Sequence, residues 1–344
     1  MKTVFTRILP GRPIIPFLYP TVGTEERGSI LFLRDAFQGL DSPFVRITDD
    51  PAECDALLLA HNFPSIRHET ASLEEFAALS KRTGKKIVVF WHGDSDSEVP
   101  LPNAVVLRTS LYGATRRPNE IAMPAYSPDL LSGAPLPLRE KSAVPTVGFC
   151  GWAEYRSLKN LLGTLVMNAL TESRAILSGN SLLRARKKGL SFRRRAIRSL
   201  QESSAVRSNF LIRRSYSGHR DTIHLDPEQA RREYIANLRD CDFALVVKGD
   251  GNYSYRFYEA LSLGRIPLLL DTDCVLPRAD SVPYDDIMVR VDFREIGSIA
   301  DRVRAAFDAM SAEEFVRRQK RAREVFEKFL SVKAFFRYVA ERLI

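Results

Sequence analysis

Short apolar runs alternate with a helical spacing of apolar residues over the first part of the chain. Residues 56–60 and 86–91 predict buried strands, residues 73–81 predict an amphipathic helix between them, and residues 105–107 predict a further strand. Strands that alternate with helices are typical of α/β proteins with a parallel sheet. We therefore expect one α/β unit in residues 1–140.

A second α/β unit is predicted after a stretch with the composition of a linker. Residues 127–145 contain four prolines, and residues 146–150 then start a new apolar strand, which a helix over about 157–170 follows. Apolar residues at helical spacing in 312–343 predict a helical tail that returns to brace the first unit. The length suits two domains, which we place at 1–140 and 141–320, with a C-terminal helix at 321–344.

The most informative stretch is 242–277. Its pattern predicts a strand over 243–247, a glycine-containing loop, a helix that opens near Ser254 and ends at Gly264, and a second strand over 266–270. In such a βαβ unit a ligand lies beyond the carboxyl ends of the strands, where the free amides of a helix N-terminus favour an anion. The pattern therefore indicates a phosphate-binding site.

Arg256 and Glu259 lie three residues apart on that helix and therefore share one face. A guanidinium in the first turn suits a diphosphate, and a carboxylate can accept hydrogen bonds from two ribose hydroxyls. The spacing is equally compatible with a surface ion pair between the two side chains.

The residues GDGNYSYRFYEALSLGRIPLLLDTDCVLP, which begin at Gly249, resemble the signature of exostosin-type glycosyltransferases, a family of inverting, two-domain enzymes. The resemblance covers roughly 144–330. It implies a nucleotide-sugar donor with Arg256 at its diphosphate and Glu259 at its ribose, and a GT-B fold, in which two Rossmann-like domains face each other across a cleft. Further donor-binding candidates are Lys248, Gly249, Gly251, Asn252, Ser254, Tyr255, Arg213 and Arg156.

Inverting transfer needs a base that takes the proton of the acceptor hydroxyl, and we expect that base at a strand end of the first domain. His92, Asp94 and Asp96 follow the predicted strand 86–91, and His61 follows 56–60. An ordinary polar turn explains the same residues. Asp94 and Asp96 also spell DxD, a metal-holding triplet of other glycosyltransferases, but a metal is not expected here because Arg256 and the helix end can replace a cation.

The net charge of +9 is concentrated, because residues 184–220 contain twelve Lys or Arg and one acid, Glu202. Such a segment suits an anionic membrane, a lipid-linked acceptor or plain solvation, and its few aromatic residues argue against nucleic acid. Four widely spaced cysteines indicate neither a disulfide framework nor a zinc site. The apolar run at 14–22 is broken by two prolines and does not suit a signal peptide.

Together these features predict a cytoplasmic, bacterial-type glycosyltransferase, a hexosyl- or pentosyltransferase of surface polysaccharide synthesis, with peripheral membrane contact as a further expectation. Its partners would be a nucleotide sugar and a glycan or lipid-linked saccharide acceptor, without a resident cofactor. Two alternatives remain open, because fold alone does not settle chemistry. One is an epimerase or hydrolase that modifies nucleotide sugars, and the other is a basic binding module without enzymatic activity.

Overall fold

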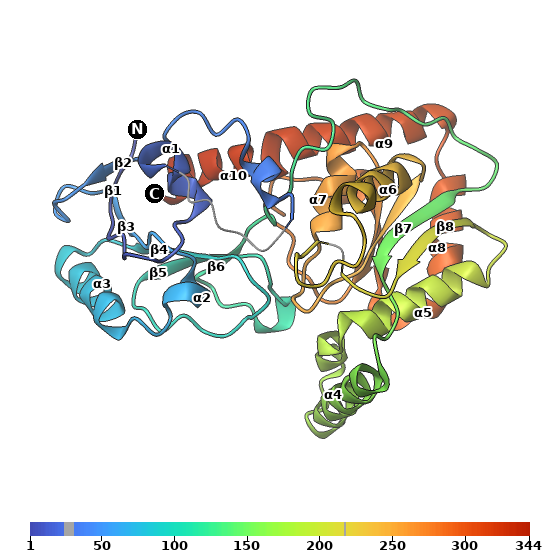
Figure 1. Cartoon of the computed structure of the whole chain (residues 1–344), viewed down its shortest axis with the longest axis horizontal. Helices are drawn as coiled ribbons and strands as arrows, with labels where there is room; N and C mark the ends of the chain where they lie inside the picture. The colour runs from blue at the N-terminus through green and yellow to red at the C-terminus, as the bar shows by residue number, and fades with distance from the viewer. Residues whose placement is uncertain (24–30, 217) are drawn as a thin grey trace.

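The computed structural model describes residues 1–23, 31–216 and 218–344 (Figure 1). Its first sheet is parallel throughout and has the strand order β2-β1-β3-β4-β5-β6. The strands are β1 (Thr3–Phe5), β2 (Arg46–Thr48), β3 (Ala56–Leu58), β4 (Ile87–Trp91), β5 (Ala104–Arg108) and β6 (Glu120–Ala122). The strands expected from the apolar runs are therefore present.

The second sheet is also parallel and has the order β11-β10-β9-β7-β8. Its strands are β7 (Thr146–Trp152), β8 (Arg207–Arg213), β9 (Phe243–Val246), β10 (Ile266–Asp271) and β11 (Val289–Asp292). Counted along the chain from β7, the order is 2-1-3-4-5, that of a doubly wound sheet. In such sheets a ligand lies at the switch point, which here is the carboxyl end of β7 and β9.

Helices cover both faces of each sheet (Figure 1). Side chains of α3 pack on one face of the first sheet, while α5 and α8 pack on one face of the second and α7 on the other. The α-helices are α1 (Tyr19–Val22), α2 (Phe63–Ile66), α3 (Thr70–Thr83), α4 (Leu158–Leu177), α5 (Gly189–Gln201), α6 (Pro227–Arg239), α7 (Tyr255–Ser262), α8 (Ile299–Asp308), α9 (Ala312–Val325) and α10 (Val332–Tyr338).

The C-terminal tail crosses from the second sheet to the first. On α9, Ala322 and Val325 pack in a core with Phe257 of α7, whereas Phe335 and Phe336 of α10 pack in the core of the first sheet. The tail is not one helix from 321, because the extended backbone of Ser331 ends one helix and caps the next. The returning tail therefore joins the two sheets.

Two further stretches differ from the sequence-based expectation. The helix expected to end near 170 continues to Leu177, since α4 contains no glycine or proline after Gly163. Residues 127–145 have the composition of a linker but are partly packed: Leu131 is buried, and Arg139 pairs with Asp242 at 2.7 Å. This stretch is therefore held against the second sheet.

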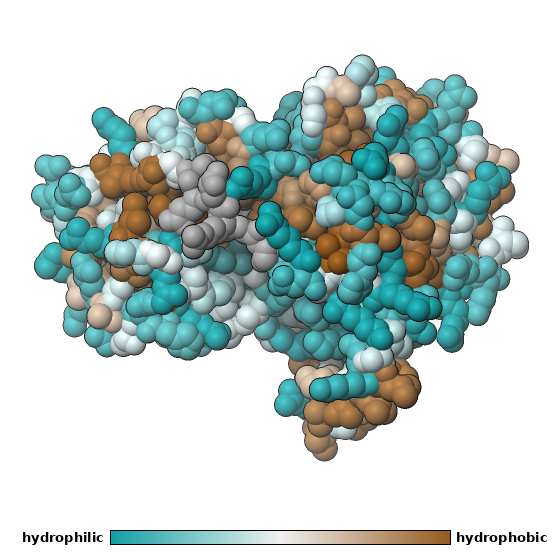
Figure 2. Space-filling view, in the orientation of Figure 1, coloured by the Kyte–Doolittle hydropathy of each residue, from teal (hydrophilic) through white to brown (hydrophobic). Residues whose placement is uncertain are grey.

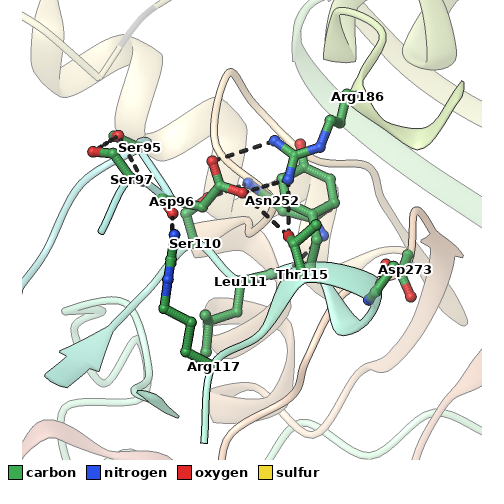
Figure 3. Close-up of polar contacts among 12 residues, drawn as sticks. Ser95, Asp96, Ser97, Ser110, Leu111, Thr115, Arg117, Arg186, Asn252 and Asp273 are labelled. Carbon is green, nitrogen blue, oxygen red and sulfur yellow. Dashed lines mark hydrogen bonds and ion pairs between the residues drawn. The ribbon is translucent and has the colours of Figure 1, made fainter. Parts of the chain in front are cut away.

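Polar contacts also join the two α/β units directly (Figure 3). The side-chain amide of Asn252 donates to the carbonyl of Leu111, and its backbone N–H donates to the hydroxyl of Ser110. A carboxylate oxygen of Asp273 accepts from the backbone N–H of Ala114 at 2.8 Å. Loops of the second sheet therefore lie against the loop that follows β5.

Candidate functional site

The helix α7 is positioned by its ends and its buried face. Ser254 has extended backbone before the first turn, and Gly264 follows the helix with φ +65°, a conformation that glycine adopts without strain. A Cβ at Gly264 would lie 2.8 Å from the carbonyl oxygen of Gln319, so the residue also allows α9 to approach. Phe257 and Leu261 are buried on the inner face. The N-terminus of α7 is thereby fixed at the carboxyl end of β9.

A cavity of about 770 Å³ lies at this point, and residues of both α/β units line it. Asp94 and Tyr126 come from the first unit, whereas the loop after β7, the loop after β9 and the first turns of α7 come from the second. The cavity therefore occupies the switch point that the sheet order indicates.

The cavity wall is rich in cations. Six basic side chains face four acidic ones. The basic residues are Arg156, Lys188, Arg193, Arg213, Arg231 and Arg256, and the acids are Asp94, Asp221, Asp250 and Glu259. Walls of one prevailing charge raise the local concentration of a ligand with the opposite charge. The cavity therefore suits an anion, and the planar forks of its arginines suit a phosphate group.

Arg256 and Glu259 both line the cavity, but each contacts other groups. The guanidinium of Arg256 lies 4.3 Å from the ring centre of Phe149 and donates to the carbonyl of Cys150. The carboxylate of Glu259 pairs with Arg231 at 3.0 Å and accepts from the hydroxyl of Tyr234 at 2.5 Å. The described structure therefore does not contain the ion pair between Arg256 and Glu259 that the spacing left open.

Arg193 of α5 is a cavity residue that the sequence reasoning did not single out, because it stood within the basic segment. Its Nη1 and Nη2 atoms donate to the carbonyls of Trp152 and Lys248, at 3.1 and 3.0 Å. Burial, together with the nearby charge of Arg256, lowers the pKa of Arg193 to about 10. Two neighbouring positive charges repel each other, and an anion bound between them offsets this repulsion. Arg193 and Arg256 are thus candidates for binding one anionic group together.

Arg231 and Tyr234 of α6 were also missed, since no motif marks them. Their contacts with Glu259 hold its carboxylate in the cavity wall. Arg231 and Tyr234 lie three residues apart on one helix, which indicates that they share a face. Only the fold shows that this face lies against α7.

Asp94 is the acid of the first unit that faces the cavity. Partial burial raises its pKa, the negative charge of Asp250 raises it further, and a hydrogen bond from Tyr253 opposes the rise. A carboxylate with a raised pKa is a stronger base than an ordinary aspartate. Asp94 therefore combines access to the cavity with the chemistry of a general base.

Asp96 lies only two residues away but has a different environment (Figure 3). Arg186 pairs with its carboxylate at 2.5 Å and also donates to Thr115. Burial raises the pKa of Asp96, but the hydrogen bond and the charge of Arg186 outweigh this effect, so that the pKa is lowered overall. Asp96 is therefore suited to hold the two units together rather than to take a proton.

The rings of both candidate histidines contact other groups of the protein. The ring of His92 stacks on that of Tyr126 with 4.3 Å between centres, and burial lowers its pKa to about 4. His61 is buried, accepts from the backbone N–H of Leu9 and lies 2.9 Å from the carbonyl oxygen of Pro13. Neither ring lines the cavity.

The other donor-binding candidates separate into two groups. Gly249, Ser254, Tyr255, Arg213 and Arg156 line the cavity. The side chain of Lys248 instead donates to the hydroxyl of Tyr112, and Asn252 is occupied by contacts with Leu111 and Thr272.

Gly251 does not line the cavity but has a clear steric role. A Cβ there would lie 2.7 Å from the Cα atom of Asp94. Gly251 therefore allows the backbones of the two units to approach each other.

The basic segment 184–220 does not form a single exposed face. Arg184 and Lys187 pair with Glu172, Lys188 pairs with Asp250, and Arg193 faces the cavity. Arg195 and Arg198 are exposed on α5. Some of the basic side chains that are neighbours in the sequence therefore lie in the wall of the cavity.

Groups of three or more His, Cys, Asp or Glu side chains with metal-binding geometry do not occur among residues 1–23, 31–216 and 218–344. The carboxylates of Asp94 and Asp96 are engaged with different partners.

Comparison with known proteins matches residues 166–306 to the Exostosin GT47 domain. A probable β-1,4-xylosyltransferase of Arabidopsis thaliana is 36% identical over 63 residues, which cover 18% of this chain and 15% of that protein. A probable glucuronosyltransferase of Oryza sativa subsp. japonica is 30% identical over 87 residues, which cover 25% of this chain and 19% of that protein. The chain thus matches less than a fifth of the length of either relative.

The matched segment contains the parts of the second unit that form the cavity. It begins within α4 and includes α5, α6, the loop after β9 and α7. The basic side chains of the cavity, except Arg156, therefore lie within it. The residues that carry the signature lie within this match, so residues 166–306 of the chain are similar to the Exostosin GT47 domain.

Proposed function

We propose that this chain is an inverting glycosyltransferase of GT-B architecture that transfers a hexosyl or pentosyl group from a nucleotide sugar to a glycan or lipid-linked saccharide. The observation that carries the proposal is that Asp94 of the first unit and several arginines of the second unit line the same cavity. The cavity thus offers both a base and positive charges for a diphosphate. Two parallel sheets with this cavity at the carboxyl end of the second support a GT-B arrangement.

In the proposed reaction Arg256 and Arg193 bind the diphosphate of the donor, and Glu259 accepts hydrogen bonds from ribose hydroxyls. Asp94 takes the proton of the acceptor hydroxyl as its oxygen attacks the anomeric carbon from the face opposite the diphosphate. The bond between the anomeric carbon and the diphosphate oxygen breaks, and its electrons leave with the diphosphate. The arginines stabilise the charge that develops there. Attack from the opposite face inverts the configuration.

The setting of the reaction is also proposed. A role in surface polysaccharide synthesis at the cytoplasmic side of a membrane is consistent with the basic segment. None of the described helices combines the length and apolar character needed to cross a membrane. We further propose that the arginines act in place of a divalent cation.

Donor binding tests the proposal. Nucleotide sugars that differ in base and sugar are screened by thermal shift, because a ligand at 100 times its Kd stabilises a protein by about 2.7 kcal/mol. We expect Arg256→Ala to weaken binding of the donor and its nucleoside diphosphate by about 10- to 150-fold, the equivalent of roughly 1.5–3 kcal/mol. Unchanged affinity in this variant would remove Arg256 from the site.

Glu259→Gln distinguishes ribose recognition from phosphate binding. We expect weaker binding of ribonucleotides and little change for inorganic pyrophosphate, since the substitution removes the negative charge and one of the two oxygens that accept from ribose hydroxyls, and leaves the arginines in place. Calorimetry with both ligands measures the difference. An enzyme that only modified nucleotide sugars would consume the donor without an acceptor, which product analysis with and without saccharide acceptors detects.

A further inference from the structure

The helix α4 exposes an apolar face along its whole length. Eight of the fourteen exposed large hydrophobic side chains of the described residues lie on this one helix, and they are between 49% and 87% exposed. Among them are Leu158, Leu162, Leu165, Leu170, Ile176 and Leu177. Contiguous exposed apolar surface of this kind marks an interaction site in soluble proteins.

The helix is held by its polar side. Its buried residues are Thr164 and Ala175, Asn168 bonds to Ser191, and Glu172 pairs with Arg184 and Lys187. The apolar side chains point away from these contacts. In Figure 1, α4 extends from the body of the molecule, and Figure 2 shows apolar surface over it. A surface helix normally has the opposite arrangement, with its apolar side packed on the core.

The charge around α4 narrows the choice of partner. Residues 158–198 contain ten Lys or Arg and one acid, Glu172, so their net charge of +9 equals that of the whole chain. The other residues balance, with 41 basic and 41 acidic side chains. A second copy docked through the same face would bring two such segments together, which like-charge repulsion opposes. An anionic surface is complementary to them.

We propose that α4 docks on an anionic lipid bilayer, with its apolar face inserted at the boundary of headgroups and acyl chains and its exposed cations Lys159 and Arg174 at the headgroups. A helix with apolar side chains on one face and nearby Lys and Arg has the properties of an interfacial helix. Lys159 and Arg174 of α4 are exposed, and no ion pair among the described residues includes either side chain. Asn160 and Thr164 of the same helix line the cavity, so docking places the cavity beside the bilayer.

Vesicle flotation tests the proposal on the full chain, with phosphatidylcholine vesicles and with vesicles of equal parts phosphatidylcholine and phosphatidylglycerol. We expect binding to the second kind, which added salt weakens. A triple variant, Leu162→Gln, Leu165→Gln and Leu170→Gln, is expected to reduce binding by about tenfold or more. The matched control replaces three leucine or isoleucine side chains of similar exposure outside α4, as Ile8→Gln, Leu138→Gln and Leu225→Gln. This control variant is expected to bind the vesicles as the unmodified protein does.

Equal binding of the unmodified protein to neutral and anionic vesicles, or binding to neither, overturns the proposal, and neither result depends on whether a variant folds. If polyglutamate binds as tightly as the anionic vesicles do, and the leucine variant binds it as tightly as the unmodified protein does, the surface recognises acidic polymers. This result also overturns the proposal. Self-association that the leucine variant abolishes, measured by sedimentation in the absence of vesicles, assigns the face to a second copy and likewise overturns the proposal. The proposal does not rest on sugar transfer, and the thermal shift with nucleotide sugars reports separately on the proposed function.

Discussion

Gly251 lies so close to Asp94 that a Cβ atom added to the glycine would be 2.7 Å from both the Cα and the Oδ1 atom of the aspartate. The two residues belong to different α/β units, and their contact fixes the distance between the loop after β4 and the loop after β9. A side chain at position 251 would also meet the ring of Tyr253 at 2.8 Å. The position of the proposed base therefore depends on the absence of a side chain in the opposite unit.

Gly251→Ala is expected to displace Asp94 and to lower turnover on the order of 100-fold, because small misplacements of a reacting group have effects of that size. Donor affinity should change little, since the arginines remain in place. Steady-state kinetics together with calorimetry measure both quantities. Gly297→Ala is the control, because a Cβ at Gly297 meets no atom within 4 Å. Normal turnover in Gly251→Ala would contradict the proposed geometry.

Asp94→Asn and Asp96→Asn should have different effects although the residues are neighbours. We expect Asp94→Asn to lower turnover by about 10²- to 10⁴-fold with nearly intact donor affinity, as loss of a general base does. In the unmodified protein, activity should fall as the pH falls through the raised pKa of Asp94, because only the carboxylate takes a proton. Asp96→Asn weakens the contact with Arg186 and should act mainly on stability. A larger loss of turnover in Asp96→Asn would assign the base to Asp96.

Two arginines of α5 allow a matched comparison, because Arg193 faces the cavity and Arg195 faces solvent. The variants are Arg193→Ala and Arg195→Ala. Loss of a charge-assisted contact to phosphate corresponds to a decrease in affinity of about 10- to 150-fold. We expect a decrease of this size for nucleoside diphosphate in Arg193→Ala and no measurable change in Arg195→Ala. Calorimetry measures both affinities, and circular dichroism checks that the variants are folded. Equal affinities would exclude Arg193 from the anion site.

Lys248 provides a pH-dependent prediction of stability. Burial, followed by the charge of Arg186, lowers its pKa from 10.5 to about 7 in the folded chain. Between these two pH values the unfolded chain binds more protons at this group, so its contribution to stability rises with pH. Lys248→Met should therefore raise the Tm most below pH 7 and lose this advantage as the pH rises towards 10. Thermal unfolding of both proteins at several pH values measures the difference in Tm. A difference in Tm that does not vary with pH would show that the pKa of Lys248 is not lowered in the folded chain.

Removal of divalent metal should leave donor binding and transfer unchanged, because arginines are proposed to neutralise the diphosphate. The measurement is turnover after extensive treatment with a chelator, and again after Mg²⁺ or Mn²⁺ is added. Loss of activity with rescue by the ion would assign a metal to the site.

Much of the local structure could be predicted from the sequence. The apolar run of β9, the capping position of Ser254 and the φ of Gly264 agree with the pattern because each depends on neighbours along the chain. Arg256 and Glu259 could be placed on one helical face at the carboxyl end of a strand for the same reason. Their partners could not be predicted, since Arg231 and Cys150 are distant in sequence.

The sequence by itself determined two α/β units, the βαβ element with its resemblance to exostosin-type enzymes, and the concentration of charge in one segment. Only the tertiary structure decided which charges face the cavity. Asp94 and Asp96 have the same side chain and nearly the same position in the chain, yet one faces the cavity and the other pairs with Arg186. Likewise, the pattern of α4 predicts a helix but not that its apolar side remains uncovered. Burial and pairing depend on which distant segments pack together, and local periodicity does not specify that packing.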